Sequence, residues 1–145
     1  AEAVAYWYFR GRVALDQQDY QKAVESLQAA VYWMPARGAE RQLRRALVYL
    51  IVARMISTGG VPSDSELVAI GLADLFTDLT AAIKRGDVAG FEAALGERAA
   101  FWMDLKVYLV VQLRLRPLLL RNLLRLTHRA LGGDSRLPIA AFTAA

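Results

Sequence analysis

The stretch that decides the fold runs from Val4 to Arg37 and reads VAYWYFRGRVALDQQDYQKAVESLQAAVYWMPAR. Along the whole chain, alanine, leucine and arginine, all good helix formers, are frequent, whereas alternating β-branched residues are rare. The apolar residues recur with a helical period, which predicts two helices, Glu2–Asp16 and Tyr20–Met34. Pro35 and Gly38 are residues that end a helix, so they close the second one. The stretch therefore predicts a helical hairpin.

The spacing within this hairpin is typical of a tetratricopeptide repeat, whose period is 34 residues. Seven residues fall at the expected offsets: Trp7, Gly11, Tyr20, Ala23, Leu27, Ala30 and Pro35. Gly11 and Ala23 are small enough for two antiparallel helices to approach closely, and Trp7 and Tyr20 fill the gaps beside them. A helical hairpin of this kind buries its apolar face by stacking on neighbours. No second copy is visible at this period, so we expect a divergent helical stack.

Helical periodicity continues outward from this hairpin to the end of the chain. The further predicted helices are Ala39–Ser57, a short one after Ser63, one over 72–85, one around Phe91–Leu95, one over Glu97–Arg116 and one over Pro117–Leu131. Ser63 and Glu66 lie three residues apart and predict a capping box. Pro117 either kinks one long helix or opens a new one. The fold class is therefore all-α, built from stacked antiparallel helix hairpins.

Composition favours binding over catalysis. The 145 residues contain no cysteine, which excludes a disulfide scaffold and thiolate chemistry, and a single histidine, His128, which excludes a multi-histidine metal site. The net charge is +4, and 15 of the 18 basic residues are arginine, which pairs well with phosphate and carboxylate groups. The start of the chain lacks the pattern of a signal peptide, and the longest apolar run, Ala46–Ala53, is too short to span a bilayer. We expect a soluble intracellular protein that binds a polyanion or an acidic protein and no membrane.

The order of several segments resembles a known family. The segments are Tyr8–Arg12, Asp19–Ala23, Arg45–Val52, Gly59–Pro62, Ala82–Asp87 and Arg121–Leu123. Together they resemble the PCI domain family, whose members occur in the proteasome lid, the COP9 signalosome and a translation initiation factor. Within it, the chain is most similar to the branch of the PCI subunit of the nuclear transcription-and-export complex 2 and the signalosome subunit twelve-like protein.

This resemblance implies a right-handed stack of helix pairs (a superhelix like that of tetratricopeptide repeats) that leads into a winged-helix module. The segment Leu137–Phe142 is similar to the opening of that module, so we expect a helical part over residues 1–136 and the start of a truncated winged helix over 137–145. The resemblance also implies a non-enzymatic scaffold without a cofactor. Such scaffolds bind a large GANP-type subunit and a small acidic DSS/Sem-type protein and assist messenger RNA export coupled to transcription. The implied location is the nucleus, with the cytoplasm as a second one.

Four arginines near the end of the chain are candidates for binding RNA, DNA or an acidic partner. Arg114, Arg121, Arg125 and Arg129 are separated by seven, four and four residues, so one continuous helix would place them on one side. A stripe of this kind suits nucleic-acid phosphates or an acidic peptide. The alternative is a solvated face opposite five leucines, which are Leu119, Leu120, Leu123, Leu124 and Leu126.

A second basic cluster and two aromatic residues are further candidates. The cluster consists of Arg37, Arg41, Arg44 and Arg45, near the start of the predicted third helix. Positive charge is unfavourable there in the helix dipole, so a compensating interaction is expected. An acidic tail is one such interaction, and a plain exposed face is the alternative. Trp33 and Trp102 are candidate anchors of a protein interface.

The chain shows no pattern of an active site. Asp74 and Asp78 are four residues apart, which is the one spacing here that resembles a carboxylate catalytic or metal pair, but they flank an apolar stripe. No phosphate-binding loop, dinucleotide fingerprint or nucleophile elbow is present. The alternatives to an export scaffold are a generic repeat adaptor that binds a peptide, a proteasome-lid or signalosome-type PCI subunit and, last, an enzyme.

Overall fold

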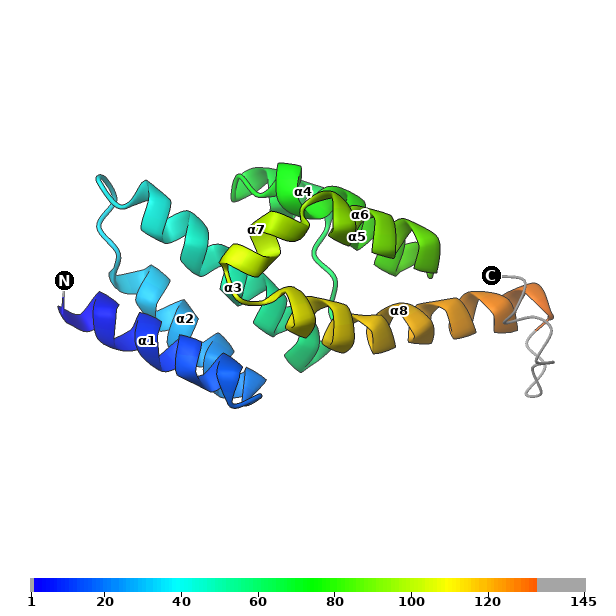
Figure 1. Cartoon of the computed structure of the whole chain (residues 1–145), viewed down its shortest axis with the longest axis horizontal. Helices are drawn as coiled ribbons and strands as arrows, with labels where there is room; N and C mark the ends of the chain where they lie inside the picture. The colour runs from blue at the N-terminus through cyan, green and yellow to red at the C-terminus, as the bar shows by residue number, and fades with distance from the viewer. Residues whose placement is uncertain (1, 133–145) are drawn as a thin grey trace. The chain divides into compact units, whose positions relative to one another are not determined.

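The structure, a computed structural model, describes residues 2–132. Over this range it contains eight α-helices and no strand, which confirms the all-α fold class (Figure 1). The helices are α1 (Glu2–Asp16), α2 (Tyr20–Trp33), α3 (Glu40–Thr58), α4 (Asp64–Ala69), α5 (Ala73–Arg85), α6 (Val88–Glu97), α7 (Ala99–Asp104) and α8 (Tyr108–Ala130). None of the helices in this range combines the length and the hydrophobicity that crossing a bilayer requires.

The chain divides into two compact units, a first unit of residues 1–74 and a second unit of residues 75–145. The predicted start of a winged-helix module at 137–145 lies outside the described residues. The boundary after residue 136 lies there too, so both stay predictions.

The first unit begins with the predicted hairpin of α1 and α2, which pack against each other. Gly11 is buried at their contact, and a Cβ atom added to it would lie 2.7 Å from Cγ of Leu27. Ala23 and Ala30 are also fully buried in this contact region of α2. The prediction that small residues let the two helices approach closely is therefore confirmed.

The third helix, α3, packs on α2 and also reaches α1 through an aromatic contact. The ring centroids of Tyr8 and Tyr49 lie 6.2 Å apart, and the guanidinium carbon of Arg12 lies 4.2 Å from the centroid of the Tyr49 ring. A guanidinium at this distance over a ring face is a cation–π contact. Two segments that carry the PCI resemblance, 8–12 and 45–52, thus join α1 to α3.

The second unit is built around large side chains from α5, α6, α7 and α8. Phe76 of α5 and Trp102 of α7 are both buried, with ring centroids 5.6 Å apart. Asn122 of α8 donates a hydrogen bond of 3.0 Å from Nδ2 to the carbonyl oxygen of Ile83, near the end of α5. A Cβ atom on Gly86, whose φ is +66°, would lie 2.6 Å from Cα of Leu123. The segments 82–87 and 121–123, which also carry the resemblance, therefore meet in one contact.

The prediction of one helix over Glu97–Arg116 is wrong, because this stretch contains α7 and the first part of α8 with a turn between them. Lys106 adopts a left-handed φ of +62°, and the N–H of Val107 donates to the carbonyl oxygen of Trp102 at 3.0 Å. This bond pattern ends a helix, and the residue with the left-handed backbone, here Lys106, is usually glycine. Val107 and Trp102 are both buried, so packing favours the turn although lysine does not.

Pro117 lies inside α8 and neither opens nor ends a helix. Proline lacks the N–H that would bond to the carbonyl of the residue four positions before it, which is Leu113. Both residues are exposed, so water can satisfy this carbonyl. The helix continues through the proline from Tyr108 to Ala130 (Figure 1).

Candidate interaction surfaces

The four predicted arginines of the C-terminal stripe all belong to α8, and all four side chains are exposed. Since α8 is continuous through Pro117, the spacing of seven, four and four residues places Arg114, Arg121, Arg125 and Arg129 along one side of it. The geometry on which this prediction depends is therefore present. The binding role of the stripe stays a prediction.

The charge of α8 is of one sign. Its 23 residues include five arginines and His128 but no aspartate or glutamate. At the surface, Arg116 Nη1 lies 3.6 Å from Oε1 of Glu92, which belongs to α6. The helix therefore carries a net positive charge of its own.

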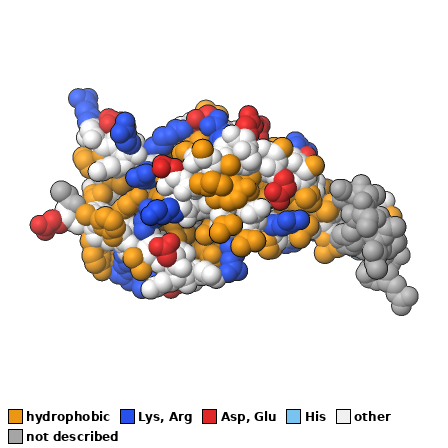
Figure 2. All heavy atoms as spheres, viewed as in Figure 1, with side chains coloured by type: hydrophobic (Ala, Val, Ile, Leu, Met, Phe, Trp, Pro, Cys, Tyr) orange, Lys and Arg blue, Asp and Glu red, His pale blue; other side chains and the backbone are white. Residues whose placement is uncertain are grey.

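A leucine seam runs along α8 as well, and the sequence reasoning missed it. We use this name for Leu109, Leu113, Leu120, Leu124 and Leu131, which are between 42% and 65% exposed. Their spacings of four, seven, four and seven residues put them on one side of the helix, with Leu131 as its C-cap. Figure 2 shows apolar and basic side chains next to one another over the part of the surface that α8 forms.

The five leucines named in the alternative, in which the arginines form a solvated face opposite them, differ in their exposure. Leu119 is buried and Leu123 is partly buried, but Leu120, Leu124 and Leu126 are more than 40% exposed. The buried face of α8 is formed instead by Val111, Leu115, Leu118 and Leu119. The spacing of the seam leucines was a signal that could have revealed a second apolar face.

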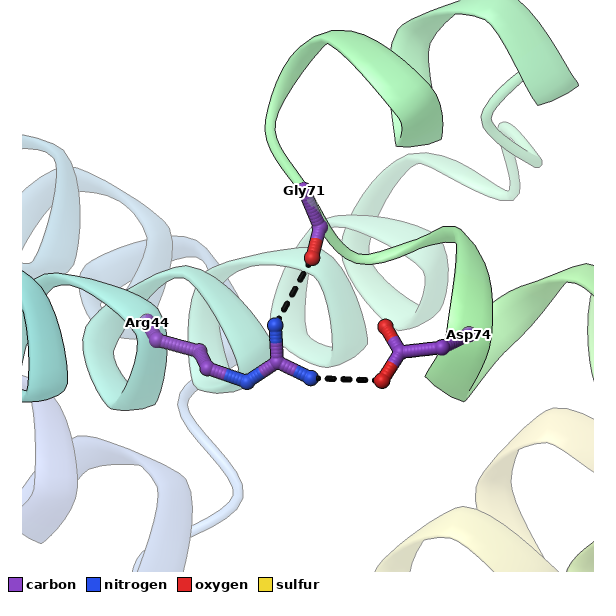
Figure 3. Close-up of polar contacts among 3 residues, drawn as sticks. All are labelled: Arg44, Gly71 and Asp74. Atoms are coloured by element: carbon purple, nitrogen blue, oxygen red, sulfur yellow. Dashed lines mark hydrogen bonds and ion pairs between the residues drawn. The ribbon is translucent and has the colours of Figure 1, made fainter.

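The basic cluster of α3 is split by the structure, because Arg44 is used inside the first unit. Arg44 donates from Nη1 to the carbonyl oxygen of Gly71 at 2.7 Å and from Nη2 to Oδ2 of Asp74 at 2.9 Å (Figure 3). It thereby ties α3 to the turn that follows α4. Arg41 and Arg45 are exposed, and neither has an ion pair among residues 2–132.

The compensating interaction expected at the start of α3 comes from the chain itself. Glu40 lies in the first turn of α3, and its Oε1 accepts a hydrogen bond of 3.1 Å from the N–H of Gly38. Bonds from the backbone N–H groups of Glu40 and Gly38 lower the pKa of the Glu40 carboxyl group. The carboxylate therefore stays ionised at the positive end of the helix dipole, close in sequence to the three arginines.

The two tryptophans have opposite environments. Trp33 is 56% exposed at the end of α2 and lies edge-on to Tyr32, with ring centroids 5.3 Å apart. Trp102 is 1% exposed, because it fills the core of the second unit against Phe76 and Phe101. The interpretation of Trp102 as a surface anchor is therefore wrong, whereas Trp33 remains a candidate.

A hollow of about 430 Å³ lies in the first unit, close to Trp33 in the sequence. Tyr8 and Phe9 of α1, Met34, Pro35 and Arg45 are among its lining residues. Its lining is mainly apolar, with the exposed guanidinium group of Arg45 as its basic member. Its volume lies within the range of pockets that bind small ligands, and its lining suits apolar groups.

The residues considered for metal or acid–base chemistry are placed as follows. Asp74 bonds to Arg44, and Asp78 is exposed on α5. His128 is partly buried in the last turn of α8. Within residues 2–132, no group of three or more His, Cys, Asp or Glu side chains is arranged to hold a metal ion.

Comparison with known proteins places the chain among PCI proteins, although no family model matches it. It is 32% identical over 145 residues to the PCI domain-containing protein 2 homolog of Caenorhabditis elegans and 30% identical over 143 residues to the CSN12 homolog of Schizosaccharomyces pombe. It is also 30% identical over 142 residues to PCI domain-containing protein 2 of Danio rerio. These alignments cover 100%, 98% and 98% of this chain but 34%, 33% and 34% of the relatives.

The chain thus spans about a third of the length of the curated relatives it matches. The matched regions include all six segments that carry the resemblance, and four of those segments form the contacts that join α1 to α3 and α5 to α8. The resemblance is confirmed: the chain belongs to the PCI family, in the branch of PCI domain-containing protein 2 and the CSN12 homologues.

Proposed function

We propose that this chain is the helical part of a non-enzymatic PCI scaffold subunit that acts in messenger RNA export coupled to transcription. Its partners are a large GANP-type subunit and a small acidic DSS/Sem-type protein, and RNA or DNA is a further ligand. It works in the nucleus and also in the cytoplasm. The observation that carries this proposal is the alignment of nearly the whole chain with relatives named PCI domain-containing protein 2.

The surface chemistry supports a scaffold that binds acidic partners. Five arginines and no carboxylate on α8, together with the unpaired Arg41 and Arg45 on α3, provide two basic regions among the described residues. Basic surfaces attract polyanions and acidic proteins and raise the rate of their association. Helix packing within each unit would hold the helix that carries each region in place while partners bind.

The test is to purify the full-length protein with an affinity tag and to identify the proteins and nucleic acids that accompany it. Export subunits are expected, and their retention should fall in the Arg121→Glu/Arg125→Glu variant. Nucleic acid that is held by phosphate contacts should be released steeply as the salt concentration rises. Recovery of proteasome-lid or signalosome subunits in place of export subunits would contradict the export role.

A signalosome-type PCI subunit is the second candidate, because several relatives carry the name CSN12 homolog. The same purification separates the two candidates through the identity of the recovered subunits. A generic peptide-binding adaptor is a third, and the hollow beside Tyr8 and Phe9 favours it. That role predicts one small peptide ligand, without a stable set of partner subunits.

A further inference from the structure

We infer that the hollow of the first unit binds the C-terminal residue of a partner protein. The apolar side chain of that residue enters the hollow, and its α-carboxylate pairs with Arg45. This inference rests on the scaffold function above and adds a ligand that is defined by the end of a chain, whatever the charge of the partner as a whole. The hollow has a volume of about 430 Å³, and its lining residues all belong to the first unit.

The walls of the hollow come from three helices that pack on one another, α1, α2 and α3. Side chains three or four residues apart lie on one side of a helix. Ala5 and Phe9 have this relation on α1, and Gln42 and Arg45 have it on α3. Met34, the C-cap of α2, lies in the wall as well. The core of the first unit therefore holds the walls in place.

The apolar walls favour a large apolar side chain. Tyr8 and Phe9 line the hollow, and the Tyr8 ring packs on the buried Tyr49 with ring centroids 6.2 Å apart. Phe9 is 64% exposed, so a ligand that covers it removes apolar surface from water, which is favourable. The unbranched side chain of Met34 can adapt to the shape of a ligand. Leucine or phenylalanine is a side chain that suits these walls.

Arg45 determines the charge of the ligand. Its side chain is exposed and forms no ion pair among residues 2–132, and no aspartate or glutamate of this range lines the hollow. A guanidinium group pairs with a carboxylate through two parallel hydrogen bonds. The amide of Gln42, three residues earlier on the same helix, is a second donor. The ligand that fits therefore carries a carboxylate next to an apolar group.

The open side of the hollow favours the end of a polypeptide over a free small molecule. Phe9, Pro35 and Arg45 are exposed lining residues, so the hollow is open to solvent. Pockets for small molecules enclose most of the surface of their ligand. A C-terminal residue needs less enclosure, because the residues before it continue into solvent. It is also the one position of a polypeptide where a carboxylate stands beside a leucine or phenylalanine side chain.

The same walls disfavour nucleic acid as the occupant. A nucleotide would bring a phosphate to Arg45, but the edge of its base carries hydrogen-bond donors and acceptors. Tyr8, Gln42 and Arg45 are the lining residues with polar side-chain groups. The other walls would leave the base atoms that face them without a partner, which costs free energy.

The first part of the test uses the 145-residue chain and a labelled octapeptide. The octapeptide consists of glycine and serine, ends in leucine with a free carboxylate and carries fluorescein at its N-terminus. Its fluorescence anisotropy should rise on binding. The same peptide with a C-terminal amide should bind at least about tenfold more weakly, because it lacks the charged partner of Arg45. A peptide that ends in serine with a free carboxylate should also bind about tenfold more weakly, because it leaves the apolar walls uncovered.

Two arginine substitutions on α3 form a matched pair. Arg45→Gln should reduce the preference for the acid over the amide to within about twofold, because a neutral side chain cannot form the charged pair. Arg54 is also exposed and without an ion pair among residues 2–132, and it lies about 180° around the helix from Arg45. Arg54→Gln should leave the preference unchanged.

Two aromatic substitutions on α1 test the apolar walls. Phe9→Ala should reduce the preference for leucine over serine about fivefold and keep the preference for the acid over the amide. Tyr6 is 57% exposed on the same helix and does not line the hollow, so Tyr6→Ala should leave both preferences unchanged. All four variants replace exposed side chains and should keep the thermal unfolding midpoint of the parent chain.

Several results would overturn the inference. One is equal binding of the acid and the amide, and another is an equal effect of Arg45→Gln and Arg54→Gln. A third is that free N-acetyl-leucine binds as tightly as the octapeptide, which would make the ligand a small molecule. A fourth is that a single-stranded RNA binds through Arg45 and Phe9 while the octapeptide does not bind.

The outcome is separable from that of the scaffold function. If the octapeptide fails to bind while the full-length protein still co-purifies with partner subunits, the role of the hollow is wrong and the scaffold function stands. If the octapeptide binds as described but no partner subunit is recovered, the hollow is a site for chain ends and the scaffold function is wrong.

Discussion

The two units of the chain differ in the share of alanine among their buried side chains. In the first unit, the helix contacts contain small residues that are at most 1% exposed, which are Ala14, Ala23, Ala30, Ala46 and Ala53. In the second unit, the core is built from large rings and leucines, among them Phe76, Phe91 and Trp102. Small residues hold long helices close together at regular offsets. Large residues fill the uneven spaces between the helices of the second unit, which range from 6 to 23 residues in length.

One glycine in each unit shows the same difference. A Cβ atom on Gly11 would meet the side chain of Leu27, which can shift, whereas a Cβ atom on Gly86 would meet the backbone of Leu123, which cannot shift easily. Gly86 also has a φ of +66°, which other residues adopt at a cost. At Gly86 the second unit therefore contains a close contact between two backbones. At Gly11 the first unit contains a contact with a side chain, which can adapt.

The largest expected effect concerns the core of the second unit. Trp102→Ala should reduce the free energy of unfolding by about 3–5 kcal/mol, because it removes a fully buried ring packed on Phe76. Trp33→Ala removes a ring that is 56% exposed and should change it by less than about 0.5 kcal/mol. Urea denaturation followed by circular dichroism measures both. A similar loss for the two variants would contradict the placement of Trp102.

A smaller difference is expected between the two glycines. Gly86→Ala should cost about 3 kcal/mol, since it adds a backbone clash to an unfavourable φ. Gly11→Ala should cost about 1 kcal/mol, because the clash with Leu27 is partly offset by the better helix propensity of alanine. Gly96→Ala in α6, where no atom lies within 4 Å of the added Cβ, is the control and should raise stability slightly. Equal costs at Gly11 and Gly86 would remove the contrast between the units.

The smallest effect is expected at the surface of the first unit. Arg44→Gln should lower the free energy of unfolding by about 0.5 kcal/mol, because the ion pair with Asp74 is about half exposed. Asp78→Asn, on the exposed side of α5, is the control and should have no effect. The loss at Arg44 should shrink in 1 M NaCl, where exposed charges are screened. A loss that persists in high salt would indicate that the bond to the Gly71 carbonyl carries most of the effect.

The hairpin of the first unit could be predicted from the sequence because each of its requirements is local. Close contact of α1 and α2 needs small residues at fixed offsets, and Gly11 and Ala23 stand at those offsets. The capping box of Ser63 and Glu66 was predictable for the same reason, and both of its hydrogen bonds are present. In the candidate site, the common side of the four α8 arginines followed from spacing once the helix was known to be continuous.

The sequence by itself determined the helical class of this protein and the first hairpin, because helix propensity and hydrophobic periodicity act within a few turns of a helix. It also determined the absence of acidic residues on α8, which is a matter of composition alone. Only the tertiary structure decided that a lysine, Lys106, separates α7 from α8, because burial of Val107 and Trp102 offsets the cost of its left-handed backbone. It also decided which leucines of α8 face water. Since α8 carries apolar residues on two sides, its hydrophobic period is compatible with burial of either side. Only its contacts with the neighbouring helices determine which side is buried.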